Sequence, residues 1–375
     1  MKAKLLLGII LTLLPCDLAL AQYLWVNLSV KAVLNPDNGQ RSYNFTEANL
    51  DATIARMNEW LALYKRGYRM RREGPILNVG GVNDTNGPSK WFYPNPRANY
   101  PFGPGRNIDQ MEKEALAAPA TYKWNSNAVN YYVVFGFWTN APADAGECAF
   151  PSAQKQMILM GTVDSAQVFL HETGHWFELY HSQSGEQFET QSGQPCNLND
   201  PCVNCPVKIA GDNDQMADTS PDHQCYASLN EVALGAYQLA IPFLDETRRS
   251  YVTNSFYNLM SYHIPPATNG PTILTELQLD RWTDFANFNR SNAISGRTWF
   301  VSLTGNDSQL GLLSTIPKRR VLAAVTASNP AGGDVVLLRP GNYNETITIN
   351  RRVTLRVPVT DWVVGGAKSA TIGRP

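Results

Sequence analysis

The sequence lacks the features that mark nucleic-acid-binding and membrane-spanning proteins. Its 375 residues carry 31 Lys and Arg against 32 Asp and Glu, which gives a formal net charge of −1. A chain so close to neutrality offers no electrostatic reason to expect a nucleic acid or an anionic membrane as partner. Beyond the N-terminal region it also has no long apolar run of the kind that forms a spanning helix. With 43% hydrophobic residues, the chain is long enough for one large globular domain and a smaller one.

The N-terminal stretch MKAKLLLGIILTLLPCDLALAQ has the three parts of a secretory signal. Lys2 and Lys4 form the basic start, residues 5–14 form the apolar centre, and a small-residue cleavage site ends at Ala21. The apolar centre is too short to span a bilayer, and a buried N-terminal core helix is the alternative. We therefore expect residues 1–21 to be a signal peptide and the mature protein to be secreted, into extracellular or periplasmic space, without a membrane anchor.

Cysteine is scarce, with six residues in the whole chain, and Cys16 lies in the signal. The other five are Cys148, Cys196, Cys202, Cys205 and Cys225. In an oxidising compartment, disulfides that cross-link a long loop are the expected use of the last four. Cys202 and Cys205 are spaced like half of a zinc knuckle, but no second such pair follows them. Because five is an odd number, at least one thiol stays outside a disulfide, and Cys148 is the candidate.

Histidine is scarcer still, yet three of the five histidines lie in the segment HETGHWFELYH, residues 171–181. His171 and His175 are four residues apart, so on a helix they share one face and both rings can reach one metal ion. His181 can join them only if the helix ends near residue 178 and the chain turns back. Three protein ligands leave one coordination position open for water and substrate, which is what a catalytic zinc site requires. Glu172, next to the first histidine, could then serve as a general base.

A short HExxH pattern also occurs in ordinary helices, so further motifs are needed to distinguish a metal site from such a helix. The long form HExxHxxGxxH belongs to the metzincin metallopeptidases, and HETGHWFELYH most resembles their pappalysin (cytophagalysin) family. Two further segments match in order: DNDQMADTSP (212–221) resembles an aspartate-containing segment of the family, and SFYNLMSYH (255–263) resembles its Met-turn. LTELQLDRW (274–282) resembles the helix after the Met-turn, and ECAFPS (147–152) resembles the edge strand before the active-site helix. The resemblance covers roughly residues 25–290.

The resemblance implies a role for each matching residue. It implies that His171, His175 and His181 bind zinc, that Glu172 is the general base, and that Tyr262 stabilises the oxyanion. The Met260 side chain would pack beneath the metal and have no direct chemical role.

The resemblance also implies a substrate and a second metal. The edge strand would pair with an extended protein or peptide substrate through backbone hydrogen bonds. The Asn- and Asp-rich stretch 197–214 could supply oxygen ligands for calcium, with solvated loop acids as the plain alternative.

Glu178 departs from the family pattern, which has glycine at this position. Glycine lets the helix end in a left-handed residue, so that the chain can bring the third histidine to the metal. A glutamate in that conformation costs about 1 kcal/mol, which metal binding can offset. The third ligand therefore depends on whether Glu178 makes this turn.

The remaining patterns predict an α+β fold in two parts. For residues 22–295 we expect a mixed twisted sheet with an active-site helix. The predicted elements are strands at 23–35, 68–81 and 128–138, short strands at 147–152 and 156–161, and helices near 45–67, 165–179, 227–240 and 273–288. Residues 83–108 read as a surface loop, and residues 182–225 as a long functional or cross-linked loop.

After residue 295 the character shifts to β-strands separated by Gly and Asn turns, with runs such as TWFVSL, DVVLLRP, ETITIN and RVTLRV. Residues 296–375 resemble the first coils of a pectate-lyase-like parallel β-helix, and a generic small all-β accessory domain is the alternative. Carbohydrate is one partner such a domain could bind. For the whole chain we expect a secreted zinc endopeptidase, and the competing hypothesis is an exported binding or adhesion module whose peptidase domain has decayed.

Overall fold

The computed structural model describes residues 23–42, 45–93, 108–135, 146–148, 156–161, 165–181, 187–189, 207–210, 258–260, 274–357 and 369–373. The strands are β1 (Leu24–Val33), β2 (Tyr68–Arg72), β3 (Leu77–Val79), β4 (Val129–Val133), β5 (Gly146–Cys148), β6 (Met157–Met160), β7 (Gln187–Glu189), β8 (Val207–Ala210), β9 (Thr298–Val301), β10 (Val335–Leu338), β11 (Gly341–Tyr343), β12 (Thr354–Arg356) and β13 (Ala370–Ile372). The helices are α1 (Glu47–Leu63), α2 (Ile108–Ala117), α3 (Pro119–Tyr122), α4 (Ala166–Trp176), α7 (Glu276–Phe288) and α8 (Val321–Ala327), with 3₁₀ turns η1 (Pro88–Trp91) and η4 (Ser291–Ala293). Within these residues no helix is both long and apolar enough to cross a membrane.

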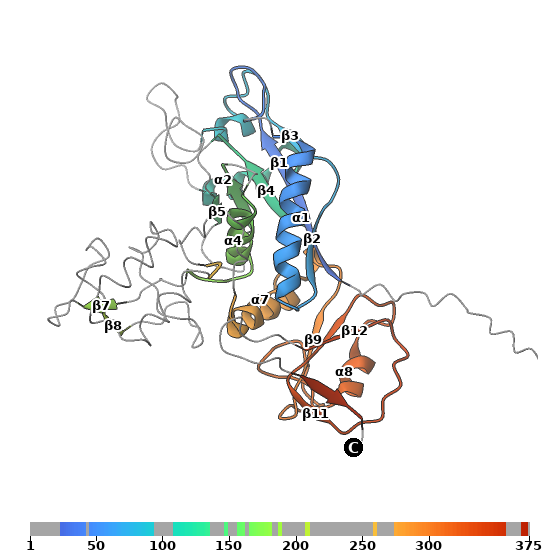
Figure 1. Ribbon diagram of the computed structural model, residues 1–375. Helices are drawn as coiled ribbons and strands as arrows, with labels where there is room; N and C mark the ends of the chain where they lie inside the picture. The colour runs from blue at the N-terminus through green and yellow to red at the C-terminus, as the bar shows by residue number, and fades with distance from the viewer. Residues whose placement is uncertain are drawn as a thin grey trace, which may run out of the picture.

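A six-stranded mixed sheet organises the first part of the chain (Figure 1). Its order is β2-β1-β4-β6-β5, and β3 pairs with the end of β1 beyond β2. The neighbours β1–β2, β1–β4 and β4–β6 are parallel, whereas β5 runs antiparallel to β6 at the edge. The predicted mixed sheet is confirmed, and so is the edge position of the strand that begins ECAFPS, although only its start is described.

Strand β4 is buried on both faces, as its continuous apolar run predicts. Tyr131 and Val133 belong to one hydrophobic cluster, while Tyr132 and Val134 belong to another, because neighbouring side chains of a strand point to opposite faces. The first cluster lies under α1, α4 and α7, and α1 and α4 run side by side over the sheet (Figure 1).

The segment predicted as a surface loop, residues 83–108, is in part a buried layer over the second face. Trp91, the last residue of η1, and the next two residues, Phe92 and Tyr93, are buried in the same cluster as Tyr132. The prediction of a surface loop was based on the many Pro, Asn and Gly residues of the segment. It was wrong here, because three consecutive aromatic rings cover the sheet. Helix α2, which the sequence analysis missed, packs beside them through Ile108 and its neighbours.

The C-terminal segment contains parallel strands and one helix. Strands β9, β10 and β12 form a parallel sheet in the order β12-β10-β9, and β11 pairs in parallel with β13. The expectation of an all-β segment was wrong, because α8 lies within it and packs on β9 and β10. ETITIN also forms no strand; the chain pairs just before it, at β11. Parallel pairing is what a β-helix coil requires, but a β-helix stays a prediction.

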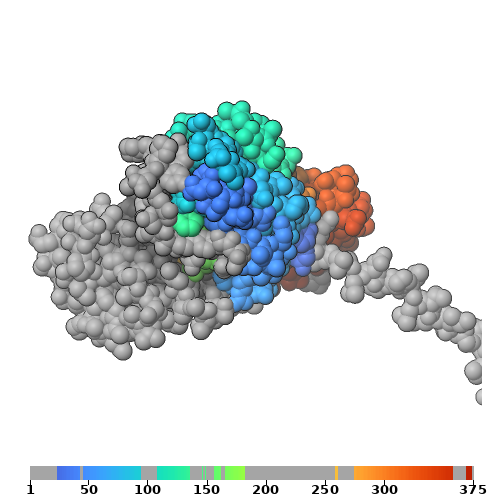
Figure 2. Space-filling model, turned by 90° about the horizontal axis from the view of Figure 1, so that it is seen from above, coloured from blue at the N-terminus to red at the C-terminus, as the bar shows by residue number. Residues whose placement is uncertain are grey.

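The two parts of the chain lie against each other. The orange and red C-terminal segment sits beside the blue N-terminal residues in both the ribbon of Figure 1 and the space-filling view of Figure 2. Arg356 of β12 lies against Gly67, where an added Cβ would be 2.8 Å from the Arg356 Nε atom. Directly before the C-terminal segment begins, Ile294 forms an isolated bridge with Val26 of β1, and the Trp25 N–H donates to the Ser295 hydroxyl.

Candidate metal centre

Helix α4 is held on the sheet by contacts along one side. Ser165 caps its N-terminus, and the Ser165 hydroxyl accepts a hydrogen bond from the Val168 N–H at 3.3 Å. The Phe169 ring stacks on Tyr131 of β4 with centroids 4.9 Å apart, and the Tyr131 hydroxyl contacts Thr173. These contacts fix the rotation of the helix, and with it the direction in which its histidines point.

The helix ends in a tight left-handed turn at Glu178. This residue has φ of 68°, in the region where a glycine is usual. The Glu178 N–H donates to the His175 carbonyl at 2.8 Å, and the Leu179 N–H donates to the Gly174 carbonyl at 2.9 Å. Glu178 thus makes the turn that the sequence pattern assigns to glycine, and the chain folds back toward the helix.

The turn brings His171, His175 and His181 into one cluster, with the candidate ligand atoms all within 4.8 Å of one another. The Nε2 atom of His181 lies 2.9 Å from that of His175 and 3.2 Å from that of His171. On the far side of two rings, His171 Nδ1 lies 2.6 Å from the Leu259 carbonyl and His175 Nδ1 lies 2.7 Å from the Leu179 carbonyl. A carbonyl only accepts, so both Nδ1 atoms carry a proton and both Nε2 atoms present a lone pair.

This arrangement fits a zinc ion. The Nε2 lone pairs of His171 and His175 both point toward His181 Nε2, and a cation between the three nitrogens would accept a lone pair from each ring. Tetrahedral zinc with Zn–N bonds of about 2.0–2.1 Å separates its ligand nitrogens by about 3.3 Å, close to the spacing here. Carbonyls that accept from Nδ1 are the usual outer partners of zinc-bound histidines. Three imidazoles at this spacing are therefore a suitable donor set for zinc.

Burial keeps the three rings neutral, the form that can bind a metal. It lowers the pKa of His171, and it holds the pKa of His175 well below the usual value, with His171 and His181 adding to the effect. Burial and then His171 lower the pKa of His181 to about 3.

Glu172 lies beneath the edge strand β5. Its side chain is buried, with 6% of the residue exposed. A Cβ atom added to Gly146 of β5 would come within 2.5 Å of the Glu172 Cγ atom and 3.0 Å of its Oε1 atom. The edge strand therefore passes directly over the carboxylate, and glycine at position 146 makes the close approach possible.

Met260 packs against α4 on the side of the metal site. It is fully buried, and a Cβ on Gly174 would lie 2.5 Å from its sulfur atom. Asn258 closes the local turn by accepting from the Met260 N–H at 2.9 Å, and it pairs with Gln278 of α7 at 3.0 Å. The sequence analysis did not find the roles of Asn258 and Gln278, although the Thr275-to-Gln278 capping box has a recognisable spacing.

Several predicted residues fall outside the described residues. Tyr262, the segments 197–206 and 211–221, the four clustered cysteines and the signal peptide are in this group, so their predicted roles remain predictions. Cys148 is described and is buried in the main hydrophobic cluster.

Fold and site together define an α/β protein with a mixed sheet and a three-histidine cluster at the end of a helix, the class of site that holds a transition metal. No protein-family model matches the sequence, and no curated protein matches it. Among solved structures the chain is similar to mature mirolysin of Tannerella forsythia in complex with a cleaved peptide, with 14% identity, a TM-score of 0.42, and coverage of 73% of this chain and 96% of that chain.

Proposed function

We propose that this protein is a secreted zinc-dependent endopeptidase that cleaves protein or peptide substrates. The observation that supports it best is the convergence of the Nε2 atoms of His171, His175 and His181, with a carboxylate next to the first of them. The resemblance of the 171–181 and 255–263 motifs to the pappalysin family points the same way.

Each group of the site has a part in this proposal. When bound, zinc acts as a Lewis acid toward the scissile carbonyl and lowers the pKa of a water molecule. Glu172 takes a proton from that water at its carboxylate and later delivers it to the leaving amine. Strand β5 pairs with the extended substrate, which places the peptide over Glu172. Tyr262 donates a hydrogen bond to the oxygen on which negative charge develops.

The test is a peptidase assay of the full-length chain on denatured protein, with and without a zinc chelator. The variant Glu172→Gln should bind one zinc ion per chain and lose activity by about 10²–10⁴-fold, because the amide cannot accept the proton. Glu59→Gln is the matched control, since Glu59 is an exposed residue of α1. Cleavage that resists chelation, or full activity in Glu172→Gln, would refute the mechanism.

The competing hypothesis, an exported binding or adhesion module, predicts a different result in the same assay. Wild-type protein with one bound zinc ion and no cleavage of any substrate would favour it. Carbohydrate binding by residues 296–375 and calcium binding by residues 197–214 are separate proposals, which glycan-array binding and calcium titration of the full chain can test.

A further inference from the structure

Helix α7 supports the metal site with one of its faces. Trp282 stacks on Phe177, the residue directly before the Glu178 turn, with ring centroids 4.2 Å apart and an interplanar angle of 22°. The Arg281 guanidinium lies 4.9 Å from the ring of Tyr180, the neighbour of His181. A shift of α7 would therefore move both ends of the turn that carries the third histidine.

Helix α7 and Arg290, two residues after its end, also contact backbone segments next to the site. Gln278 pairs with Asn258, whose turn presents the Leu259 carbonyl to His171. Just after α7, the Arg290 side chain donates from Nε to the Trp176 carbonyl, at the C-terminal end of α4. Asn258 directly precedes Leu259, whose carbonyl accepts from His171, and Trp176 directly follows His175.

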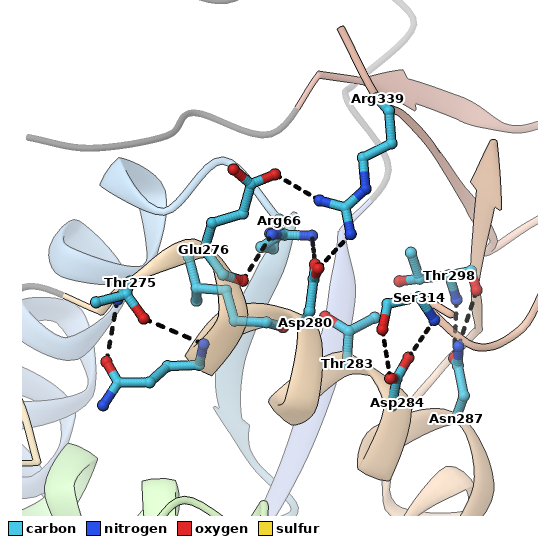
Figure 3. A network of polar contacts seen from close by, with 12 residues as sticks. Arg66, Thr275, Glu276, Asp280, Thr283, Asp284, Asn287, Thr298, Ser314 and Arg339 are labelled. Atoms are coloured by element: carbon cyan, nitrogen blue, oxygen red, sulfur yellow. Dashed lines mark hydrogen bonds and ion pairs between the residues drawn. The ribbon is translucent and has the colours of Figure 1, made fainter. Parts of the chain in front are cut away.

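The opposite face of α7 binds the C-terminal segment through polar side chains one helical turn apart. Asp284 accepts from the Ser314 N–H at 2.7 Å and from the Ser314 hydroxyl at 2.6 Å. Asn287 donates to the Thr298 and Leu312 carbonyls at 2.8 and 2.7 Å, and accepts from the Thr298 N–H. Figure 3 shows these side chains along one side of the helix.

Arg339, which directly follows β10, completes this face. Its guanidinium pairs with Glu276 at 2.5 Å and also with Asp280 (Figure 3). Asp280 is buried and pairs at 2.8 Å with Arg66, which is buried too. Without Arg339, the buried Asp280 carboxylate would keep only Arg66 as an ion-pair partner, and the half-buried Glu276 carboxylate would lose the Arg339 guanidinium, so the helix would keep its position only at a cost.

We propose that the C-terminal segment is part of the metal centre's support, and that Arg339 is a positioning residue that acts through α7 on the His181 turn and on the Asn258–Met260 segment. The inference rests on the proposed function only where it concerns a peptidase; the coupling from Arg339 to the three histidines affects zinc binding, whatever reaction the site performs. The segment is then a structural part of the peptidase and not an accessory that could be removed from it.

The experiment measures zinc affinity of the full-length protein by competition with a chelator, and the visible spectrum of the Co²⁺-substituted protein. Arg339→Met should weaken zinc binding by up to about tenfold and change the cobalt spectrum; the effect stays at or below the lower end of that of a direct outer partner, because Arg339 acts through α7. Arg339→Lys should fall between Arg339→Met and the wild type, since one ammonium reaches a single carboxylate. Arg319→Met is the control: this arginine is exposed, lies in the same segment, and should leave both readouts unchanged.

Unchanged zinc affinity and an unchanged cobalt spectrum in Arg339→Met would overturn the proposal, even if its melting temperature falls. If Arg339→Met does not fold, Arg339→Lys decides: several-fold weaker zinc binding supports the proposal and wild-type affinity overturns it. The two proposals fail separately. Wild-type protein that binds zinc without cleaving peptides refutes the peptidase alone, whereas variants with wild-type zinc affinity refute the positioning role alone.

Discussion

The third histidine reaches the metal site through one strained residue. Glu178 has φ of 68°, a conformation that costs a residue with a Cβ atom about 1 kcal/mol. The hydrogen bond from the Leu179 N–H to the Gly174 carbonyl closes the turn, and the Phe177–Trp282 stack supports it from below. Zinc would add to this support, because a ligand that binds only the folded turn stabilises it.

Substitutions at Glu178 should separate backbone strain from side-chain chemistry. Glu178→Gly should bind zinc at least as tightly as the wild type and unfold at an equal or higher temperature, because glycine takes a left-handed conformation freely. Glu178→Val should weaken zinc binding about tenfold, since a β-branched residue resists this conformation most. Chelator competition and thermal melts of both variants provide the measurement. Equal zinc affinity in the two would show that the turn does not limit the site.

Lys31 is a second residue whose effect on the free energy of unfolding can be measured. It lies fully buried in β1, where its Nζ atom donates to the Ser29 carbonyl at 3.1 Å and to the Asn130 side chain. Burial lowers the pKa of Lys31 from 10.5 to about 7, although Glu73 opposes the effect. The folded protein therefore releases this proton near neutrality, while the unfolded chain keeps it up to about pH 10.5.

This difference predicts that stability rises with pH between about 7 and 10.5. In that window the unfolded state binds the extra proton, so raising the pH favours the folded state; the gain is complete above 10.5 and lost by about pH 7. Lys31→Met should raise the free energy of unfolding at pH 7 by a few kcal/mol, on the order expected for a buried charge, and remove the slope between pH 7 and 9. Urea unfolding at three pH values tests this, with exposed Lys113→Met as control. A slope that survives in Lys31→Met would contradict the assignment.

At the scale of elements, strand β5 and helix α4 approach so closely at Gly146 that no side chain fits between them. Gly146→Ala should place a methyl group 2.5 Å from the Glu172 Cγ atom and push the carboxylate aside. We expect unchanged zinc affinity and about 10²-fold lower peptidase activity, the size of effect that a misplaced catalytic group produces. Gly81→Ala is the control, because no atom lies within 4 Å of the added Cβ there. Full activity in Gly146→Ala would show that Glu172 does not need its present position.

The elements that could be predicted are those whose pattern and environment agree. The apolar run of β4, the helical spacing in α1 and the helix predicted at 273–288, which is α7, each match the burial that tertiary packing imposes. Trp91–Tyr93 were missed because turn-forming neighbours hid an aromatic layer. ETITIN was predicted as a strand on its alternation, but the chain pairs at β11 instead, so tertiary context overrode propensity.

The candidate site likewise has parts that could be predicted from the sequence and parts that could not. Spacing alone places His171 and His175 on one face of a helix, and the family pattern predicts that His181 joins them. The partners of the rings could not be predicted, because the Leu259 and Leu179 carbonyls are backbone groups without a sequence signature. The contact between Gly146 and Glu172 depends equally on how a distant strand approaches the helix.

At the scale of the whole molecule, α7 belongs to two packing units at once. Leu279 and Trp282 lie in the main hydrophobic cluster, whereas Asp284 and Asn287 bind the C-terminal segment. Neighbouring residues of β10 divide likewise: Val335 lies in the main cluster and Val336 in the C-terminal one. A boundary near residue 295, where the sequence changes character, thus falls between parts that share buried residues.

Shared buried residues predict a single unfolding transition for residues on both sides of position 295. If the C-terminal segment separated first, Asn287, Asp280 and Val335 would lose their buried partners, and each unsatisfied polar group would cost about 1–3 kcal/mol. Calorimetry of the full chain should therefore give one transition, with equal calorimetric and van't Hoff enthalpies. Arg339→Met should lower that transition as a whole, because the ion pairs it removes join the two parts. Two resolved transitions, with Arg339→Met shifting only one, would show instead that the segment is an independent domain.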